Sequence, residues 1–298
     1  MTDAPAPDFD VDAALAGQLV ATQHPDLVGP IHLVANGWDN AVFRLRDDLA
    51  IRMPRRTLAV PLVRNELRWL PEIARRLPVA VPAPVRVGRP APDLGYDVPW
   101  SIVPWFPGRS GTDVDPAIRG TAAGALAAFV TAMGAPAPAD APVNPFRGVP
   151  LADRDEVVRA RLAGGRIPHA ARLAGVWERA LAASVWSEQP MWLHGDLHPG
   201  NLVLAASGTL TAVVDFGDLT AGDPATDLAT AWLTFDPGAR RAFRTELEQR
   251  RGRPIDEATW DRARGWALVL GTAVVEQAGT QGAFGRMGAH ALEQVLGD

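Results

Sequence analysis

The chain has 298 residues, of which 47% are apolar and none is cysteine, so it can bury a substantial core but holds neither a disulfide framework nor a thiolate metal site. Its formal net charge of −5 argues against a nucleic-acid partner, which usually binds a basic surface. The longest uncharged apolar stretch, residues 266–275, is too short to cross a bilayer, and the N-terminus lacks the pattern of a secretory signal, so we expect a cytoplasmic protein without a membrane partner.

The N-terminal third of the chain favours a small sheet with flanking helices. Short runs of apolar and β-branched residues are separated by polar, turn-like residues, which is typical of strands. A later segment has apolar residues at helical spacing between Pro61 and Pro78. The expected elements are a helix at 11–22, strands at 31–34, 41–45 and 49–53, a helix at 62–77, and strands at 81–87 and 100–103.

The rest of the chain is mainly helical. Residues 104–108, Pro-Trp-Phe-Pro-Gly, end the strand pattern abruptly. An Ala-rich helix is expected next, followed by a long loop rich in Pro and Ala at 134–150. The expected helices are at 115–133, in two stretches between 151 and 187 that break near the glycines at 164–165, and at 239–251, 257–275 and 280–296.

Two apolar runs in the second half of the chain frame a set of polar residues. The first lies in Trp-Leu-His-Gly-Asp-Leu-His-Pro-Gly-Asn-Leu-Val-Leu at 192–204, and the second begins Ala-Val-Val-Asp-Phe-Gly-Asp at 212–218. Both runs favour buried strands. We therefore expect Asp196, Asn201 and Asp215 to converge. One carboxylate that accepts a hydroxyl proton, with an amide and a second carboxylate that hold Mg²⁺ against nucleotide phosphates, is the arrangement of phosphoryl transfer.

The spacing of these residues resembles the catalytic loop of protein kinases. In that loop Asp is followed by Leu and, five positions after the Asp, by Asn; the metal-binding Asp opens a later Asp-Phe-Gly. Asp196 and Asn201 have this spacing, and Asp215 opens a literal Asp-Phe-Gly. The preceding His-Gly-Asp, in place of His-Arg-Asp, is similar to the aminoglycoside phosphotransferase family, which includes macrolide phosphotransferases. The resemblance covers most of the chain.

This resemblance implies an α+β, two-lobed protein-kinase-like fold. A small N-terminal antiparallel sheet lobe with one main helix, residues 1–103, would bind the nucleotide. Residues 104–108 would form the hinge. Residues 109–298 would form a larger, mostly helical lobe with the catalytic and acceptor-binding residues.

The resemblance also implies a role for each site residue. Asp196 would be the catalytic base, and Asn201 and Asp215 would bind Mg²⁺. Arg52 takes the position of the usual phosphate-pairing lysine and would form an ion pair with Glu66. The hinge residues that would meet the base of ATP or GTP are Val103, Pro104 and Phe106.

Several of these assignments have alternatives in the sequence. The chain contains no lysine, and Arg52 keeps a permanent charge but differs from lysine in reach and geometry. The loop at 36–40, which would cover the phosphates, has a single glycine and equally fits a plain hairpin turn. Glu66 can instead pair locally with Arg64 or Arg68, and the hinge can be a linker without a ligand. His194 is expected to support its loop, whereas His198 can face either the loop or the substrate.

The acceptor is less clear from the sequence. Residues 180–239 contain seven acids and no lysine or arginine, which favours a cationic substrate unless the catalytic chemistry already accounts for these acids. Aromatic residues in the following helices suit either an apolar pocket or the core, namely Trp232, Phe235, Trp260 and Trp266.

The family resemblance favours inactivation of an aminoglycoside or macrolide antibiotic by O-phosphorylation. A metabolic kinase acting on a choline-, homoserine- or sugar-type acceptor is the alternative, and a non-catalytic nucleotide-binding protein is a lesser one. The oligomeric state is not readable from the sequence.

Overall fold

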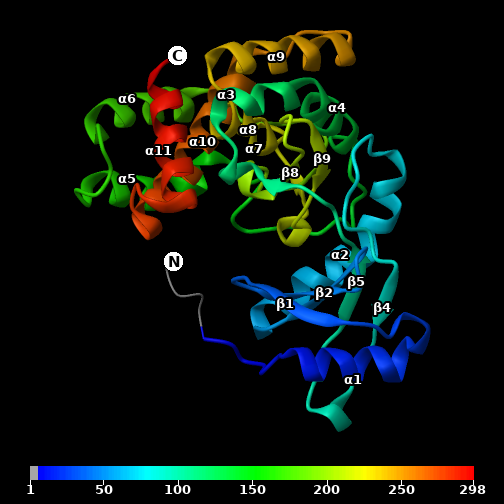
Figure 1. The fold of residues 1–298 in the computed structure, drawn as a ribbon. Helices are drawn as coiled ribbons and strands as arrows, with labels where there is room; N and C mark the ends of the chain where they lie inside the picture. Colours follow the sequence, from blue (N-terminus) through cyan, green and yellow to red (C-terminus); the bar gives the residue numbers. More distant parts are fainter. Residues whose placement is uncertain (1–5) are drawn as a thin grey trace. The chain divides into compact units, whose positions relative to one another are not determined.

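The structure is a computed structural model that describes residues 6–298, and the chain divides into two compact units (Figure 1). Of the described residues, one unit comprises 6–76 together with Ala80–Phe106, and the other comprises Leu77–Val79 and Pro107–Asp298. Within the described residues, no helix is long and apolar enough to cross a membrane.

The N-terminal unit is built on a five-stranded antiparallel sheet with strand order β1-β2-β3-β5-β4. The expected sheet lobe is therefore present, with both helices that the sequence predicted for this part of the chain. The elements are α1 (Ala13–Gln23), β1 (Ile31–Asn36), β2 (Asn40–Leu45), β3 (Leu49–Pro54), α2 (Val60–Ile73), β4 (Arg86–Gly88) and β5 (Trp100–Pro104).

Alternating side chains of the central strands form the core of this unit. Phe43 of β2, Ile51 of β3 and Ile102 of β5 are fully buried in one apolar cluster, because successive strand residues point to opposite faces. The prediction of a strand at 81–87 was wrong over most of its length, because only β4, which begins at Arg86, pairs with β5. Pro82 and Pro84 lack the N–H that a strand ladder needs, which restricts pairing to the residues after them.

The C-terminal unit is mostly helical and contains two small antiparallel sheets, β6-β8-β9 and β10-β7. The helix expected at 115–133 is interrupted by a 3-10 turn at Gly120–Ala122, since glycine weakens a helix interior. The helices are α3 (Pro116–Arg119), α4 (Ala123–Met133), α5 (Asp155–Ala163), α6 (Ala170–Ala182), α7 (Ala225–Leu228), α8 (Thr230–Thr234), α9 (Pro237–Arg251), α10 (Glu257–Ala278) and α11 (Gly282–Leu296). The strands are β6 (Arg109–Ser110), β7 (Met191–Leu193), β8 (Leu202–Leu204), β9 (Leu210–Val213) and β10 (Thr220–Gly222).

Helix α10 is the central element of the C-terminal unit (Figure 1), because it packs against α5, α6, α7, α8 and α11. The four aromatic residues that suited either a pocket or the core are all buried to at least 98%: Trp232, Phe235, Trp260 and Trp266. They therefore belong to the core and do not line an acceptor pocket.

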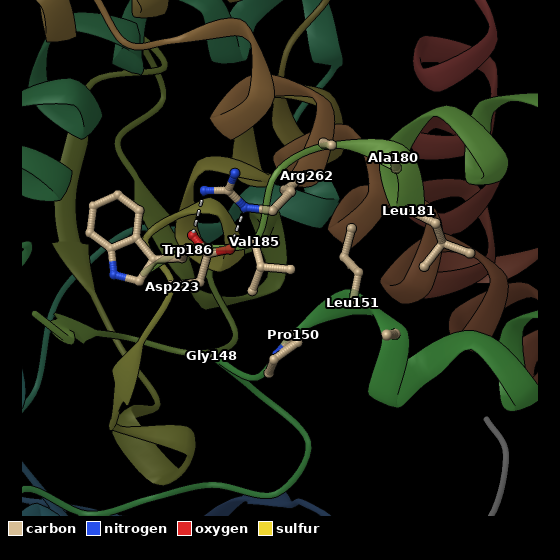
Figure 2. A pocket seen from close by; sticks show the side chains of 11 residues that line it. Gly148, Pro150, Leu151, Ala180, Leu181, Val185, Trp186, Asp223 and Arg262 are labelled. Carbon is tan, nitrogen blue, oxygen red and sulfur yellow. Dashed lines mark hydrogen bonds and ion pairs between the residues drawn. The ribbon is translucent and has the colours of Figure 1, made fainter. Parts of the chain in front are cut away.

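A buried ion pair joins α10 to the loop before α7 (Figure 2). The guanidinium of Arg262 donates to both carboxylate oxygens of Asp223, at 2.6 and 3.2 Å. Arg262 also donates to the carbonyl oxygen of Ser184 and to the hydroxyl of Thr259. The pair lines a small cavity of about 80 Å³. A buried charge that loses its partner is strongly destabilising, so this pair makes the fold depend on both residues.

We expect Asp223→Ala to lower the free energy of unfolding by about 3–5 kcal/mol, because it leaves the Arg262 guanidinium buried without its carboxylate. Denaturant unfolding measures the loss. Arg250→Ala is the matched control, since Arg250 pairs with Glu246 one turn earlier on the surface of α9 and should change stability by less than about 1 kcal/mol. Equal effects of the two variants would contradict the assigned role of the pair.

His290 of α11 makes stability sensitive to pH. Burial lowers the pKa of His290 from 6.5 to about 4, and the charges of Arg119 and Arg240 act in the same direction. Between these values the unfolded chain binds a proton that the folded protein does not, so stability should fall as the pH falls from about 6.5 to about 4, by up to roughly 3 kcal/mol. His290→Gln should flatten this part of the pH profile of unfolding. An unchanged slope would refute the assignment.

Candidate active site

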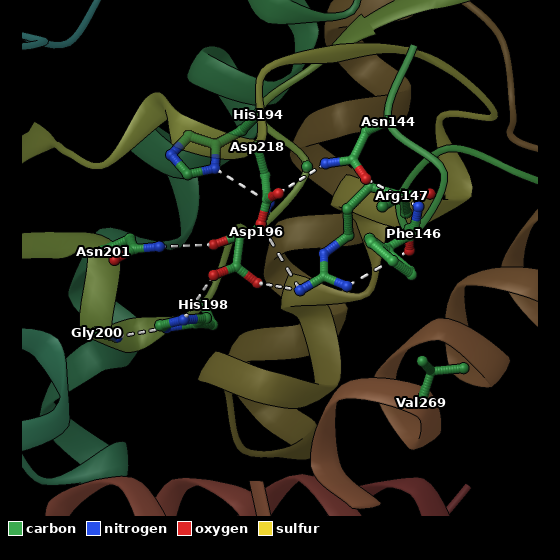
Figure 3. A network of polar contacts seen from close by, with 12 residues as sticks. Asn144, Phe146, Arg147, His194, Asp196, His198, Gly200, Asn201, Asp218 and Val269 are labelled. Atoms are coloured by element: carbon green, nitrogen blue, oxygen red, sulfur yellow. Dashed lines mark hydrogen bonds and ion pairs between the residues drawn. The ribbon is translucent and has the colours of Figure 1, made fainter. Parts of the chain in front are cut away.

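The structure brings Asp196 and Asn201 together in one loop (Figure 3). Asp196 lies between β7 and a 3-10 turn, Pro199–Asn201, that precedes β8. The side-chain amide of Asn201 donates to the backbone carbonyl of Asp196 at 2.8 Å. The backbone carbonyl of Asn201 accepts from the Val214 N–H at 2.9 Å. Because Val214 precedes Asp215, the pairing of β8 with β9 links all three sequence-predicted residues.

His194 supports this loop from inside the unit. Its ring is fully buried and lies 4.6 Å from the ring of Phe216, centroid to centroid. Nε2 is 3.0 Å from the carbonyl oxygen of Val214, and Nδ1 is 3.3 Å from the backbone nitrogen of Asp196. These contacts assign the proton to Nε2, which donates, whereas Nδ1 accepts. His194 therefore has the supporting position that the sequence indicated.

The carboxylate of Asp227 in α7 holds the same loop through its backbone. It accepts from the N–H of His194 at 2.7 Å and from the N–H of Gly195 at 2.9 Å. Burial raises the pKa of Asp227, against the opposing effects of His194 and of these two bonds. These two backbone donors are needed because burying a carboxylate without hydrogen-bond donors is strongly destabilising.

Gly195 explains why the motif is His-Gly-Asp. Its φ is +86°, and a Cβ at this position would lie 2.2 Å from the carbonyl oxygen of Asp218. Only glycine tolerates both the backbone conformation and this approach without movement. The loop carrying Asp196 is thereby packed directly on the segment that follows Asp215.

The carboxylate of Asp196 is bound on both sides (Figure 3). Nη2 of Arg147 lies 3.1 Å from Oδ1, and Nε2 of His198 lies 3.2 Å from Oδ2. Burial raises the pKa of this carboxyl, but His198, Arg147 and His194 together hold it well below its usual range. Asp196 is therefore ionised at neutral pH. It is a weak base that is suited to accept a hydrogen bond and orient a hydroxyl group.

Arg147 was not found by sequence reasoning. It lies in the long loop at 134–150, within a stretch that has no motif, and its Nη2 is also 3.7 Å from Oδ2 of Asp218. Asn144 of the same loop donates to Asp218 at 2.6 Å. Burial raises the pKa of Asp218, with Asp196 adding to the effect and Arg147 opposing it. The loop thus supplies positive charge to a segment that contains no cation of its own.

Asn201 and Asp215 fit a magnesium site in chemical type. Asp215 is exposed and has a left-handed backbone, φ +64°. The bond from Asn201 to Asp196 uses the amide nitrogen and leaves the carboxamide oxygen for a hard cation. Across residues 6–298, no group of three His, Cys, Asp or Glu side chains is arranged to hold a metal. Mg²⁺ uses one or two protein oxygens together with phosphates and water.

The N-terminal unit contains the other sequence-predicted residues. Arg52 of β3 forms an ion pair with Glu66 of α2, and both side chains are largely buried, so the predicted pair is present. Val103 and Pro104 end β5, opposite Ala50 and Leu49 of β3. Phe106 is the last residue of this unit before the chain continues as Pro107.

Comparison with known proteins places this geometry in a family. Residues 30–266 match the phosphotransferase enzyme family. The chain belongs to this family. The match confirms the resemblance predicted from the sequence and the expectation of an enzyme, a kinase-type phosphotransferase that acts on hydroxyl groups. No curated protein matches the chain.

Solved structures of phosphotransferases share the fold. A wild-type aminoglycoside 2'-phosphotransferase in complex with GDP is 18% identical, with 96% of this chain and 99% of that chain covered and a TM-score of 0.68. A GDP and kanamycin complex of an aminoglycoside phosphotransferase is 19% identical, covering 93% and 97%, with a TM-score of 0.65. A macrolide 2'-phosphotransferase from Brachybacterium faecium is 24% identical, covering 95% and 98%, with a TM-score of 0.63. These similarities confirm the expected kinase-like fold.

We expect Gly195→Ala to reduce both stability and turnover of this phosphotransferase. The strained backbone alone should lower the free energy of unfolding by about 1–3 kcal/mol, and the new methyl group must displace Asp218 and the loop of Asp196. Gly175→Ala is the control, because a Cβ there meets open space within α6 and should leave turnover unchanged while raising stability by about 0.5–1 kcal/mol. Normal turnover of Gly195→Ala would show that the close contact between Gly195 and Asp218 is not needed to position Asp196.

Proposed function

We propose that this phosphotransferase transfers the γ-phosphoryl group of a nucleoside triphosphate, ATP or GTP, to a hydroxyl group of a small molecule in a Mg²⁺-dependent reaction. The observation that carries the proposal is the ionised carboxylate of Asp196. It is held in a loop whose backbone is bound by Asp227 and whose partner Asn201 lies next to the Asp215 segment. This is the donor set that phosphoryl transfer requires.

Asp196 orients the acceptor hydroxyl for in-line attack. Its low pKa makes it a poor proton acceptor in the ground state. The transition state of phosphoryl transfer is loose, so positioning and charge stabilisation contribute most of the acceleration and early proton removal contributes little. Arg147 and His198 fix the carboxylate, and each oxygen keeps a lone pair for the hydroxyl.

Asn201 and Asp215 would hold Mg²⁺, which neutralises charge on the phosphates when bound. In the N-terminal unit, the Arg52–Glu66 pair takes the place of the usual lysine pair. Because arginine can bond two phosphate oxygens at once, we assign Arg52 to the α- and β-phosphates. Backbone groups of Val103, Pro104 and Phe106 would meet the base. Pro104 offers only its carbonyl oxygen.

The acceptor class remains between antibiotics and metabolites. The kanamycin complex and the macrolide phosphotransferase among the similar structures support an aminoglycoside or macrolide acceptor. The metabolic alternative is favoured by a different observation, the arginine residues near Asp196. A non-catalytic nucleotide-binding protein is disfavoured, because such a protein has no need to hold Asp196 and Asn201 in this arrangement.

We expect Asp196→Asn to lower kcat by about 10²-fold or more, because the neutral amide loses the negative charge that orients the acceptor hydroxyl and that pairs with Arg147 and His198. Nucleoside triphosphate consumption should be measured with Mg²⁺ and with ATP and GTP in parallel. The acceptors should include kanamycin, streptomycin, erythromycin and hydroxylated metabolites. Chelation of Mg²⁺ should abolish turnover.

The control for this experiment is Asp93→Asn, which removes an exposed carboxylate from a turn of the N-terminal unit and should leave kcat unchanged. Near-normal turnover of Asp196→Asn would remove Asp196 from the reaction. Failure of the wild-type protein to bind any nucleotide would overturn the proposed function itself.

A further inference from the structure

Three arginine residues of the C-terminal unit interact electrostatically with one another, namely Arg147, Arg154 and Arg161. Arg147 binds Asp196 directly. Its neighbour Phe146 has its ring 5.4 Å below the guanidinium carbon of Arg154. Arg154 is the N-cap residue of α5, and Arg161 lies in the last turn of the same helix, seven residues later. The positive charges of Arg147 and Arg154 help to lower the pKa of Arg161, after burial as the largest cause, so the three groups share one electrostatic environment.

Two of these arginine residues lack an anionic partner. Among the residues that the structure describes, neither Arg154 nor Arg161 has a carboxylate at ion-pair distance. Nε of Arg154 is buried and has no hydrogen-bond partner within the described chain. Arg161 donates to the carbonyl oxygen of Val269 in α10. Glu276 of α10 acts on Arg161 electrostatically, but its carboxylate is paired with Arg166 at 3.3 Å.

Asp153 and Glu276 offset this charge only in part, since burial and the neighbouring arginine residues still lower the pKa of Arg154 and of Arg161. The carboxylates of the active-site loop already have partners. Asp196 and Asp218 share Arg147, and Asp196 is bound by His198 as well. Burial lowers the pKa of Arg154, and the charge of Arg147 lowers it further. Partly desolvated guanidinium groups that repel one another are stabilised when an anion binds between them.

Exposed aromatic side chains flank the same place. Phe146 is 57% exposed and is next to Arg147 in the chain (Figure 3). Phe284 of α11 is 52% exposed, and its ring lies 6.0 Å from the ring of His198, which binds Asp196. Phe146 is therefore adjacent in the chain to Arg147, and Phe284 packs against His198. Arg147 and His198 both bind the Asp196 carboxylate. Exposed aromatic rings beside polar anchors are typical of small-molecule sites.

We propose that the acceptor carries an anionic group, a carboxylate or a phosphate, which Arg154 and Arg161 bind while its hydroxyl group meets Asp196. The apolar part of the acceptor then packs against Phe146 and Phe284. Arg147 stays on Asp196 and Asp218. This inference rests on the proposed function, and it selects an anionic hydroxy compound over a polycationic aminoglycoside.

Calorimetric titration tests the binding half of the proposal without catalysis. The full-length protein is first saturated with Mg²⁺ and ADP, so that the nucleotide phosphate positions are filled, and is then titrated with malonate or with inorganic phosphate. We expect binding of at least one probe, weakened about tenfold or more in the Arg154→Gln/Arg161→Gln double variant. The stronger probe identifies the anion as carboxylate or phosphate.

Matched variants separate a local role from a general loss of charge or structure. Arg159→Gln removes a charge from the same helix, where Arg159 already pairs with Asp155 and Glu178, and should bind the probes like the wild type. Arg154→Lys keeps the positive charge, so it should bind the probes more tightly than the double variant does. This comparison distinguishes a loss of charge from a loss of folded structure. Equal affinity of the wild type and the double variant, or no binding of either probe, would overturn the proposal.

Steady-state kinetics test the catalytic half. Hydroxy acids and sugar phosphates should be turned over with higher kcat/KM than their methyl esters or neutral sugars. The double variant should raise KM for the acceptor by about tenfold or more while KM for ATP stays the same. Efficient phosphorylation of kanamycin that is undiminished in the double variant would overturn the anionic assignment while leaving the proposed function intact. Failure of ADP to bind in the first step would instead refute the proposed function.

Discussion

The geometry of the candidate site depends on the two hydrogen bonds that the buried carboxylate of Asp227 accepts from the loop below Asp196. A buried carboxylate must find donors inside the protein, and here the donors are consecutive backbone N–H groups. Their direction sets the path of the chain at His194 and Gly195. The ring of His194 then fixes the distance to Val214, so the position of Asp196 relative to the Asp215 segment is determined from beneath rather than by the substrate.

Compensation of charge over long sequence distances is the second organising feature. The stretch at 180–239 contains acids and no lysine or arginine, which as a sequence pattern favours a cationic ligand. In the folded protein, Arg147 from the preceding loop binds Asp196 and Asp218, and Arg262 from α10 binds Asp223. Three of the seven acids are thus paired with arginine residues from outside the stretch. The charged residues within a stretch of sequence therefore do not by themselves determine the electrostatic potential around it in the folded protein.

The same distinction explains which parts of the molecule the sequence predicts. Asp196 and Asn201 are five residues apart and are joined by one local turn, so their spacing alone indicates their contact. The pairing of Arg52 with Glu66 follows from a strand and the helix after it. The position of Arg147 depends on the path of a loop without regular structure, for which no periodicity exists. Similarly, helical spacing cannot tell whether Trp260 and Trp266 face a core or a pocket; that depends on which helices cover them.

The parts of the fold that define the family do not determine which acceptor the enzyme binds. The Asp196 loop and its support act on the phosphoryl group and the hydroxyl, which all acceptors share. Selectivity must come from groups farther from the reacting atoms. Two unit charges 4 Å apart interact by about 4 kcal/mol near a protein surface. Arg154 and Arg161, to which the described residues offer no carboxylate at ion-pair distance, would therefore disfavour a polycation bound beside them and favour an anion. A phosphotransferase of this fold can therefore select the opposite charge of acceptor without any change in its phosphoryl chemistry.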